Sequence, residues 1–252
     1  MEILSALRSP IHIKHNTTMN IAPILAKALQ DLDKSMQGML NDTKIACISE
    51  TISNYAIAAA AACAIEGLAP GIAGVAAALT QAGFIWATYI KINKTLGISM
   101  SEHTVKFIGS AIVTNLITSA GSIIVILIGS SLLSIIPLAG QATAVALNAV
   151  LGYTLVYTSA IIYLRLITRM MQPDGTINVS ESDDTKHIIH NILKEAKLKD
   201  IVNEGKASFK QAKDSGKINM SQDQLRCHKC GTKVAQGQRF CSECGHNLNE
   251  LD

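Results

Sequence analysis

Four cysteines near the end of the chain have the residue type and the spacing of a metal site. They form two Cys-x-x-Cys pairs separated by ten residues: Cys227, Cys230, Cys241 and Cys244. Zinc prefers four ligands in a tetrahedron, and cysteine thiolates suit it well. A glycine follows each pair, at Gly231 and Gly245, and relieves the backbone where the chain turns back. The pattern predicts a zinc ribbon with a small β-hairpin.

Four thiolates fill the coordination shell, so this zinc is structural and leaves no position for substrate or water. His228 and His246 lie beside the ligands and are interpreted as surface residues. A disulfide pair and a redox Cys-x-x-Cys are the alternatives, and the duplicated spacing favours zinc over both. Thiolates held by a metal suit a reducing compartment.

The remaining sequence gives little sign of other chemistry. It lacks the phosphate-binding loop G-x-x-x-x-G-K-[ST], the nucleophile motif G-x-S-x-G and the zinc-protease motif H-E-x-x-H. His187 and His190 lie near Asp183 and Asp184 at spacings that could hold a metal weakly, but acidic residues favour a helix N-terminus in any case. We expect a protein that is not an enzyme.

The charged residues are few and unevenly placed. Hydrophobic residues make up 48% of the chain and charged residues 16%, and the net charge of +3 is too small to indicate nucleic-acid binding. Residues 107–164, which are 58 residues, contain no Asp, Glu, Lys or Arg, and neither do the 24 residues 67–90. A hydrocarbon layer of about 30 Å needs roughly 20 apolar residues to be crossed by a helix. The pattern therefore favours membrane spans.

The long uncharged segment can hold two crossings, at 108–135 and 139–164, with a turn at Pro137 and Gly140. Residues 51–65 and 67–90 could form a second, shorter hairpin. A break of the first crossing near Gly121 is an open alternative. So is a soluble bundle that hides its apolar hairpin until it inserts, as pore-forming proteins do.

Loop charges predict the orientation. Lys91, Lys94 and Lys106 share one loop, and Arg165 and Arg169 follow the last span. The positive-inside rule puts both groups on the cytoplasmic side, together with the zinc ribbon. No signal peptide is evident. We expect the inner membrane of a bacterium. Ionisable residues inside spans often mark transport pathways, and the two candidates, Glu66 and His103, lie at a helix boundary and in a loop.

The flanking regions have amphipathic patterns. Six apolar residues near helical spacing predict a packing helix in the first region: Ile24, Leu25, Leu29, Leu32, Met36 and Leu40. A second pattern covers residues 181–213, with Ser180 as a candidate cap, and ends in a basic, solvated linker. Ser101 is a plausible N-cap for the helix that follows it. The expected regions are 1–50 (amphipathic helices), 51–170 (apolar membrane domain), 171–224 (amphipathic helix and linker) and 225–252 (zinc ribbon).

Two resemblances add to these predictions. The segment Phe240 to Gly245 (FCSECG) matches the second knuckle of a short zinc-ribbon family. Residues 65–168 resemble the family called domain of unknown function 697, through these features: Ala69-Pro70-Gly71, Gln81, Ile136-Pro137, Gly140, Gly152, Tyr153, Tyr157 and Tyr163. That family is membrane-associated and often joined to a GTPase. This chain has no nucleotide-binding loop, so the resemblance implies at most a separate GTPase partner.

Taken together, the sequence predicts a mainly α-helical protein of apolar hairpins with a small β zinc ribbon. We expect it to contact membrane lipid and to form homo-oligomers through small-residue helix faces, such as Gly67/Gly71 and Gly74/Ala78. The ribbon would then dock a protein partner.

Overall fold

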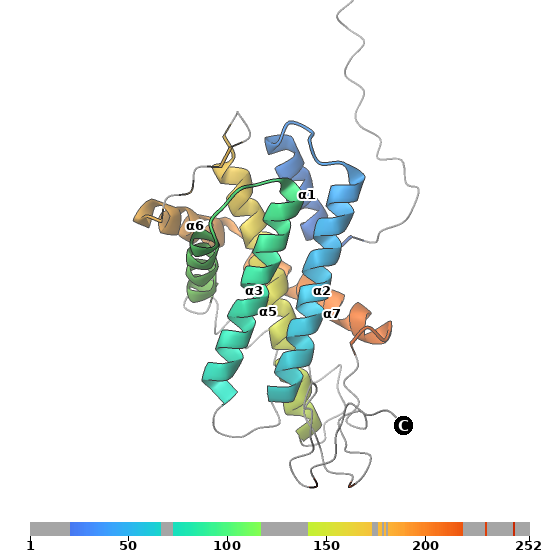
Figure 1. Cartoon of the computed structure of the whole chain (residues 1–252). Helices are drawn as coiled ribbons and strands as arrows, with labels where there is room; N and C mark the ends of the chain where they lie inside the picture. The colour runs from blue at the N-terminus through green and yellow to red at the C-terminus, as the bar shows by residue number, and fades with distance from the viewer. Residues whose placement is uncertain are drawn as a thin grey trace, which may run out of the picture.

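The computed structural model describes residues 21–66, 73–116, 141–172, 176, 177, 179, 181–218, 230 and 244. This part of the chain is mainly helical (Figure 1). The expected turn at Pro137 and Gly140, most of the expected span at 108–135 and the β-hairpin of the ribbon lie outside the described residues. So does the Gly67/Gly71 pair.

Helices account for the fold. In chain order they are α1 (Pro23–Ser35), α2 (Asp42–Glu66), α3 (Ala73–Leu96), a helix at 102–116, α5 (Gln141–Met170), α6 (Asp183–Glu195) and α7 (Leu198–Asp214). Local sequence sets several of their ends. Pro23 occupies the first turn of α1, where its missing N–H costs nothing. Gly97 follows α3 with a φ of 76°, a left-handed conformation that ends helices and favours glycine.

Ser101 caps the helix at 102–116, as the sequence predicts. Its Oγ accepts a hydrogen bond of 3.0 Å from the backbone N–H of Thr104. This bond satisfies one of the four N–H groups that the first turn of a helix leaves without a partner. Val105 is buried one residue later, and Met100 packs against the core from the other side of the cap.

Helix α5 is the centre of the bundle, and it packs against α1, α2, α3, α6 and α7. An α-helix has about 3.6 residues per turn, so Gly152, Ser159 and Tyr163 share one face of α5. That face meets α2 and α3: Tyr89 of α3 donates from its hydroxyl to the Ser159 carbonyl at 3.0 Å and stacks on Tyr163.

The opposite face of α5 meets α7. Tyr153 packs edge-on against Phe209, with ring centroids 5.6 Å apart. Gly205 of α7 faces Tyr157 and Thr154, where a Cβ added to the glycine would lie 3.2 Å from the tyrosine ring. In Figure 1, α2 and α3 lie in front of α5 and α7 passes behind it. The helices therefore form layers on two sides of α5.

Small residues let α2 approach α5 closely. A Cβ added to Gly152 would lie 2.8 Å from the backbone oxygen of Ala59 and 2.9 Å from Cys63 Sγ. Buried alanines line the same side of α2, at Ala56, Ala59 and Ala60. At this contact between described helices, small residues thus serve packing within the chain.

The helix boundaries differ from the expected regions in two places. Helix α2 runs from residue 42 to 66 and passes through the expected boundary between residues 50 and 51, because exposed Glu50 lies on its outer side and interrupts nothing. The pattern at 181–213 forms two helices separated at Ala196 and Lys197, and the N-cap position of the first is Ser182, without a side-chain cap hydrogen bond, instead of Ser180.

The basic end of the second pattern is also part of the bundle. Phe209 and Ala212 of α7 are buried in the common core, although the segment carries four lysines and the sequence predicts a solvated linker there. The apolar residues predicted to pack in the first region do so: Leu25, Leu29, Leu32, Met36 and Leu40 are buried, and Ile24 packs against the same core. The flanking amphipathic helices therefore cover the apolar helices in one core.

We expect Gly152→Ala to destabilise the bundle by about 1–3 kcal/mol, because its new methyl group meets the backbone oxygen of Ala59 and the short side chain of Cys63. Gly83→Ala on α3 is the matched control. Nothing lies within 4 Å of a Cβ there, and alanine in a helix should stabilise by about 0.5–1 kcal/mol. Chemical denaturation of both variants measures the difference, and equal effects would contradict this account of the α2–α5 contact.

Candidate metal centre and membrane surface

The second cysteine of each pair, Cys230 and Cys244, lies in a turn. Cys230 is exposed and Cys244 is half-buried. A turn at the same position of both Cys-x-x-Cys pairs is the local geometry that brings two sulfurs towards one ion. Cys227 and Cys241 lie outside the described residues. The four cysteines of the sequence are a donor set that suits a structural zinc.

No other metal site is found in the described part of the chain, where no three His, Cys, Asp or Glu side chains gather closely enough to hold an ion. The possible metal ligands on α6 do not form such a group. Asp183 lies in the first turn of the helix and pairs with Lys186 at 2.9 Å, which lowers the pKa of its carboxyl group.

The described helices place their charged ends together. Near one end of the bundle, Cys47 Sγ of α2 lies 3.6 Å from Thr95 Oγ1 of α3. Towards the other end, Gln81 Nε2 of α3 lies 2.7 Å from Cys63 Sγ of α2. The antiparallel pair thus brings the lysine-bearing end of α3 beside the charged start of α2. Helix α5 runs in the same direction as α3, because Tyr163 near the end of α5 donates to Asn93 Oδ1 near the end of α3 at 2.7 Å.

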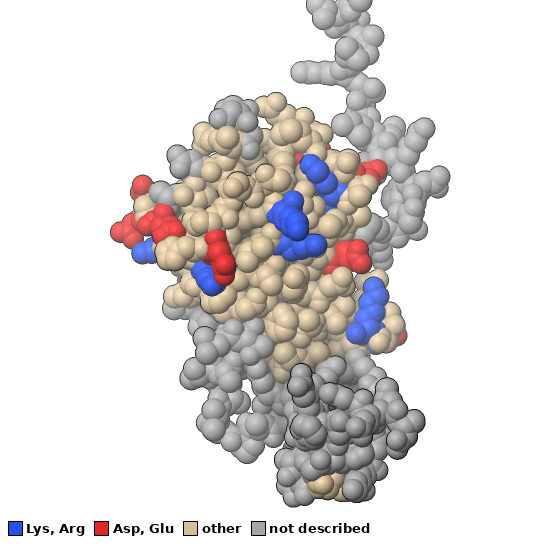
Figure 2. Space-filling model, in the orientation of Figure 1, with Lys and Arg blue, Asp and Glu red and all other residues tan. Residues whose placement is uncertain are grey.

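Uncharged segments consequently lie side by side. They are residues 51–65 of α2, 73–90 of α3, 107–116 and 141–164 of α5. We call this part the uncharged half of the bundle. Its outer surface is also apolar: half-buried residues of α2 include Tyr55, Ile57, Ala58, Ala61 and Ala62. Figure 2 shows few charged side chains over this region. A surface of this kind is poorly solvated by water and compatible with lipid.

Two described helices are long and apolar enough to cross a membrane, Asp42–Ala64 and Val145–Met170. They differ in what surrounds them. The apolar window of the second is 78% buried inside the protein, but that of the first is only 39% buried. Length and composition alone are weak evidence for a span. Helix α5, which contains the expected span 139–164 from residue 141 on, is a core helix of this bundle, whereas α2 keeps an outward apolar face.

A single carboxylate joins three helices. Glu204 of α7 accepts hydrogen bonds from the backbone N–H groups of Ile24 at 2.7 Å and Leu25 at 3.1 Å. Its Oε1 also accepts from the hydroxyl of Tyr157 on α5 at 2.9 Å. Ala22, at the N-cap of α1, has no side-chain bond to offer, so Glu204 caps α1 from another helix. Its negative charge also favours a helix N-terminus.

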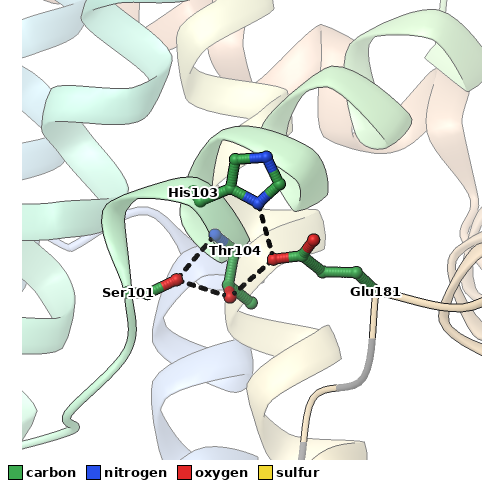
Figure 3. A network of polar contacts seen from close by, with 4 residues as sticks. All are labelled: Ser101, His103, Thr104 and Glu181. Carbon is green, nitrogen blue, oxygen red and sulfur yellow. Dashed lines mark hydrogen bonds and ion pairs between the residues drawn. The ribbon is translucent and has the colours of Figure 1, made fainter.

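Polar contacts at the surface hold the helix at 102–116 to the segment before α6 (Figure 3). Glu181 Oε1 lies 2.8 Å from His103 Nδ1 and accepts from the Thr104 hydroxyl at 3.0 Å. The bond from His103, with the bond from Thr104, holds the pKa of the Glu181 carboxyl below its usual range. His103 is 81% exposed, so it takes part in a surface tie and lies on no buried proton pathway. Glu66 is the last residue of α2, and its side chain lies outside the described residues.

The comparisons with known proteins identify one part of the chain. Residues 226–248 match the zinc-ribbon domain family, which includes all four cysteines of the predicted site. This match supports zinc binding by the ribbon. No match is found to the domain of unknown function 697 or to a GTPase-associated domain. No curated protein and no solved structure gives a significant match.

We expect Glu204→Ala to destabilise the bundle by about 2–4 kcal/mol, because it leaves two backbone N–H groups and a tyrosine hydroxyl without their acceptor. Glu50→Ala, at an exposed position of α2, removes the same charge and should change stability little. Thermal unfolding of both variants tests this. A Glu204 variant as stable as the Glu50 variant would show that the three-helix contact contributes nothing.

We expect the purified chain to hold stoichiometric zinc, and Cys227→Ser to lose it while the helical circular dichroism persists. The metal supplies most of the folding free energy of a ribbon, whereas the helices are held by their own apolar core. Cys47→Ser is the control, because Cys47 lies in the bundle. Zinc is measured by elemental analysis, and zinc retained by Cys227→Ser would exclude the four-thiolate site.

Proposed function

We propose that this protein is a non-enzymatic, membrane-associated helical bundle that offers its zinc ribbon to a protein partner. The observation that carries the proposal is the segregation of charge along four helices, which leaves one half of the bundle without a charged residue on any of them. Exposing this apolar surface to water is unfavourable, and contact with lipid removes it from water and lowers the free energy.

The location of the ribbon follows from the same charges. Lys91, Lys94 and Lys106 lie at the end of the bundle where the uncharged half stops. Lysines next to apolar segments favour the cytoplasmic side of a membrane, which is also where zinc thiolates stay reduced. We propose the cytoplasmic side of the inner membrane of a bacterium for the ribbon. A closed zinc site has no vacant position for a substrate, which supports docking as its role.

A second candidate function has an observation in its favour. The long apolar helix α5 is mostly buried under other helices, as the inserting helix of a soluble pore-forming protein would be. In that case the chain is soluble until a trigger releases α5 into a membrane. Self-association of the chain remains a prediction in both cases, and chemical crosslinking in membranes measures it.

Fractionation of cells separates the two functions. If the first proposal holds, the full-length chain is found with membranes, resists a high-salt wash and is released by detergent. A chain that purifies from the soluble fraction as a monomer without detergent contradicts it. Dye release from vesicles by that soluble protein would then support the pore-forming alternative.

The docking role has its own test. Affinity purification from membranes solubilised with detergent should recover a protein with the intact chain and lose it with Cys227→Ser, whose helices remain folded. The Cys47→Ser variant, which keeps its zinc, should recover the same protein. Recovery that does not depend on Cys227 would show that the ribbon is not the docking site.

A further inference from the structure

The outer face of α2 and α3 combines basic and apolar side chains in one place. Among the described residues, the exposed large hydrophobic side chains are Met39, at 53%, and Ile90, at 43%. Each lies beside a lysine. Lys44 Nζ contacts the carbonyl oxygen of Met39 at 3.5 Å, and Ile90 directly precedes Lys91.

The lysines form one group across the two helices. Lys91 and Lys94 are exposed and three residues apart, which makes them neighbours on the surface of α3. The contact of Cys47 with Thr95 places the start of α2, with Lys44, against the same end of α3. Figure 2 shows Lys and Arg side chains over the upper parts of α2 and α3, with acidic side chains beside them and residues that are not charged below.

These lysines have no acidic partner among the described residues. Lys27, Lys34, Lys106, Lys186 and Lys210 each pair with a carboxylate within 4 Å, whereas Lys44, Lys91 and Lys94 form no such pair. Helix α2 also carries two exposed acidic residues near these lysines: Asp42 at its start and Glu50 at the boundary with the uncharged half. Three lysines against two acids leave this end of the face with a small excess of positive charge.

Below the lysines the same face is apolar. The exposed and half-buried positions of α3 that precede Lys91 along its outer side are Gly83, Ala87 and Ile90. On α2 the outer side beyond Asn54 is lined by tyrosine, isoleucine and alanine. The helices that carry most of the paired charges, α1, α6 and α7, pack on α5. An amphipathic surface with one basic border is what binds the boundary of an anionic bilayer.

We propose that the α2–α3 face is the membrane-contacting surface, with Lys44, Lys91 and Lys94 bound to anionic phospholipid headgroups and Ile90 and Met39 inserted beside them. The inference rests on the membrane association proposed above and adds the face and the lipid class. It also fits the position of α7. The charges of α7 lie level with Tyr153 and Tyr157 of α5, but on the other side of the bundle, so they stay out of the hydrocarbon.

The test is binding of the full-length chain to vesicles of equal parts phosphatidylglycerol and phosphatidylcholine, and to vesicles of phosphatidylcholine alone. Lys91→Gln/Lys94→Gln should lower the partition coefficient on anionic vesicles about thirty-fold. Lys194→Gln/Lys199→Gln, on α6 and α7, is the matched control. It removes the same charge at two exposed positions and should keep wild-type binding.

Salt separates the two components of the surface. Binding through lysines weakens as salt rises, whereas binding through inserted side chains persists. Ile90→Ser should therefore lower the binding that remains at high salt, and Lys91→Gln/Lys94→Gln should lower mainly the binding at low salt. Circular dichroism confirms that each variant is folded.

The other outcomes overturn the proposal in distinguishable ways. Equal losses in the two double variants would show attraction by net charge without a defined face. Wild-type binding that is the same on both vesicles and unaffected by the lysine changes would remove the headgroup site and leave membrane association standing. A shift from dimer to monomer in Lys91→Gln/Lys94→Gln without any loss of lipid binding would make the face a contact between copies. Absence of wild-type binding to both vesicles would remove the membrane association as well.

Discussion

Helix α5 sets the constraint on which the rest of the structure depends. Residues 141–164 contain no charged side chain, and a helix of this length cannot be left in water on any side. The bundle meets this requirement by covering α5 on opposite faces, with α2 and α3 on one and α7 on the other. The flanking amphipathic helices bury their apolar faces against α5. Segments from both ends of the chain are therefore part of the same core.

The two groups of helices packed on α5 differ in the polarity of their outward faces, so the two sides of the bundle differ as well. Helices α1, α6 and α7 are amphipathic, so their apolar residues meet α5 and their paired charges meet water. Helices α2 and α3 carry their charges at one end. Along the rest of their described outer side the residues are mostly alanine, glycine and a few larger apolar residues, with Asn54 among them. Glu204 fixes the polar side by holding α7, α1 and α5 together. The side whose outward residues are mostly apolar, formed by α2 and α3, is the one that suits lipid.

Several features follow from sequence alone because their causes are local. The cap at Ser101 needs only the residues that follow it, and the buried residues of α1 need only their spacing. The zinc ribbon is specified by two Cys-x-x-Cys pairs that lie close together in the sequence, and the family match covers both.

Other features depend on contacts between distant residues. Glu204 caps a helix that begins almost at the other end of the chain, and nothing near Ile24 indicates it. Since α5 is apolar on every side, its periodicity does not tell which helix lies on which face. The expected boundary between residues 50 and 51 lies inside α2, because one charge on the outer side of that helix, at Glu50, leaves it intact. A long uncharged helix likewise has the same sequence pattern in a bilayer and in a protein core, so burial of α5 needs the structure.

Trp86 gives the most direct measurement of the central claim, that the uncharged half of the bundle contacts hydrocarbon through α2 and α3. It is the only tryptophan in the chain, it is half-buried on α3, and it lies one turn from Ile90 towards the uncharged end. Its fluorescence should be quenched by lipids brominated on their acyl chains when the protein binds vesicles. Binding that leaves Trp86 fluorescence unquenched at every bromine position would contradict the account.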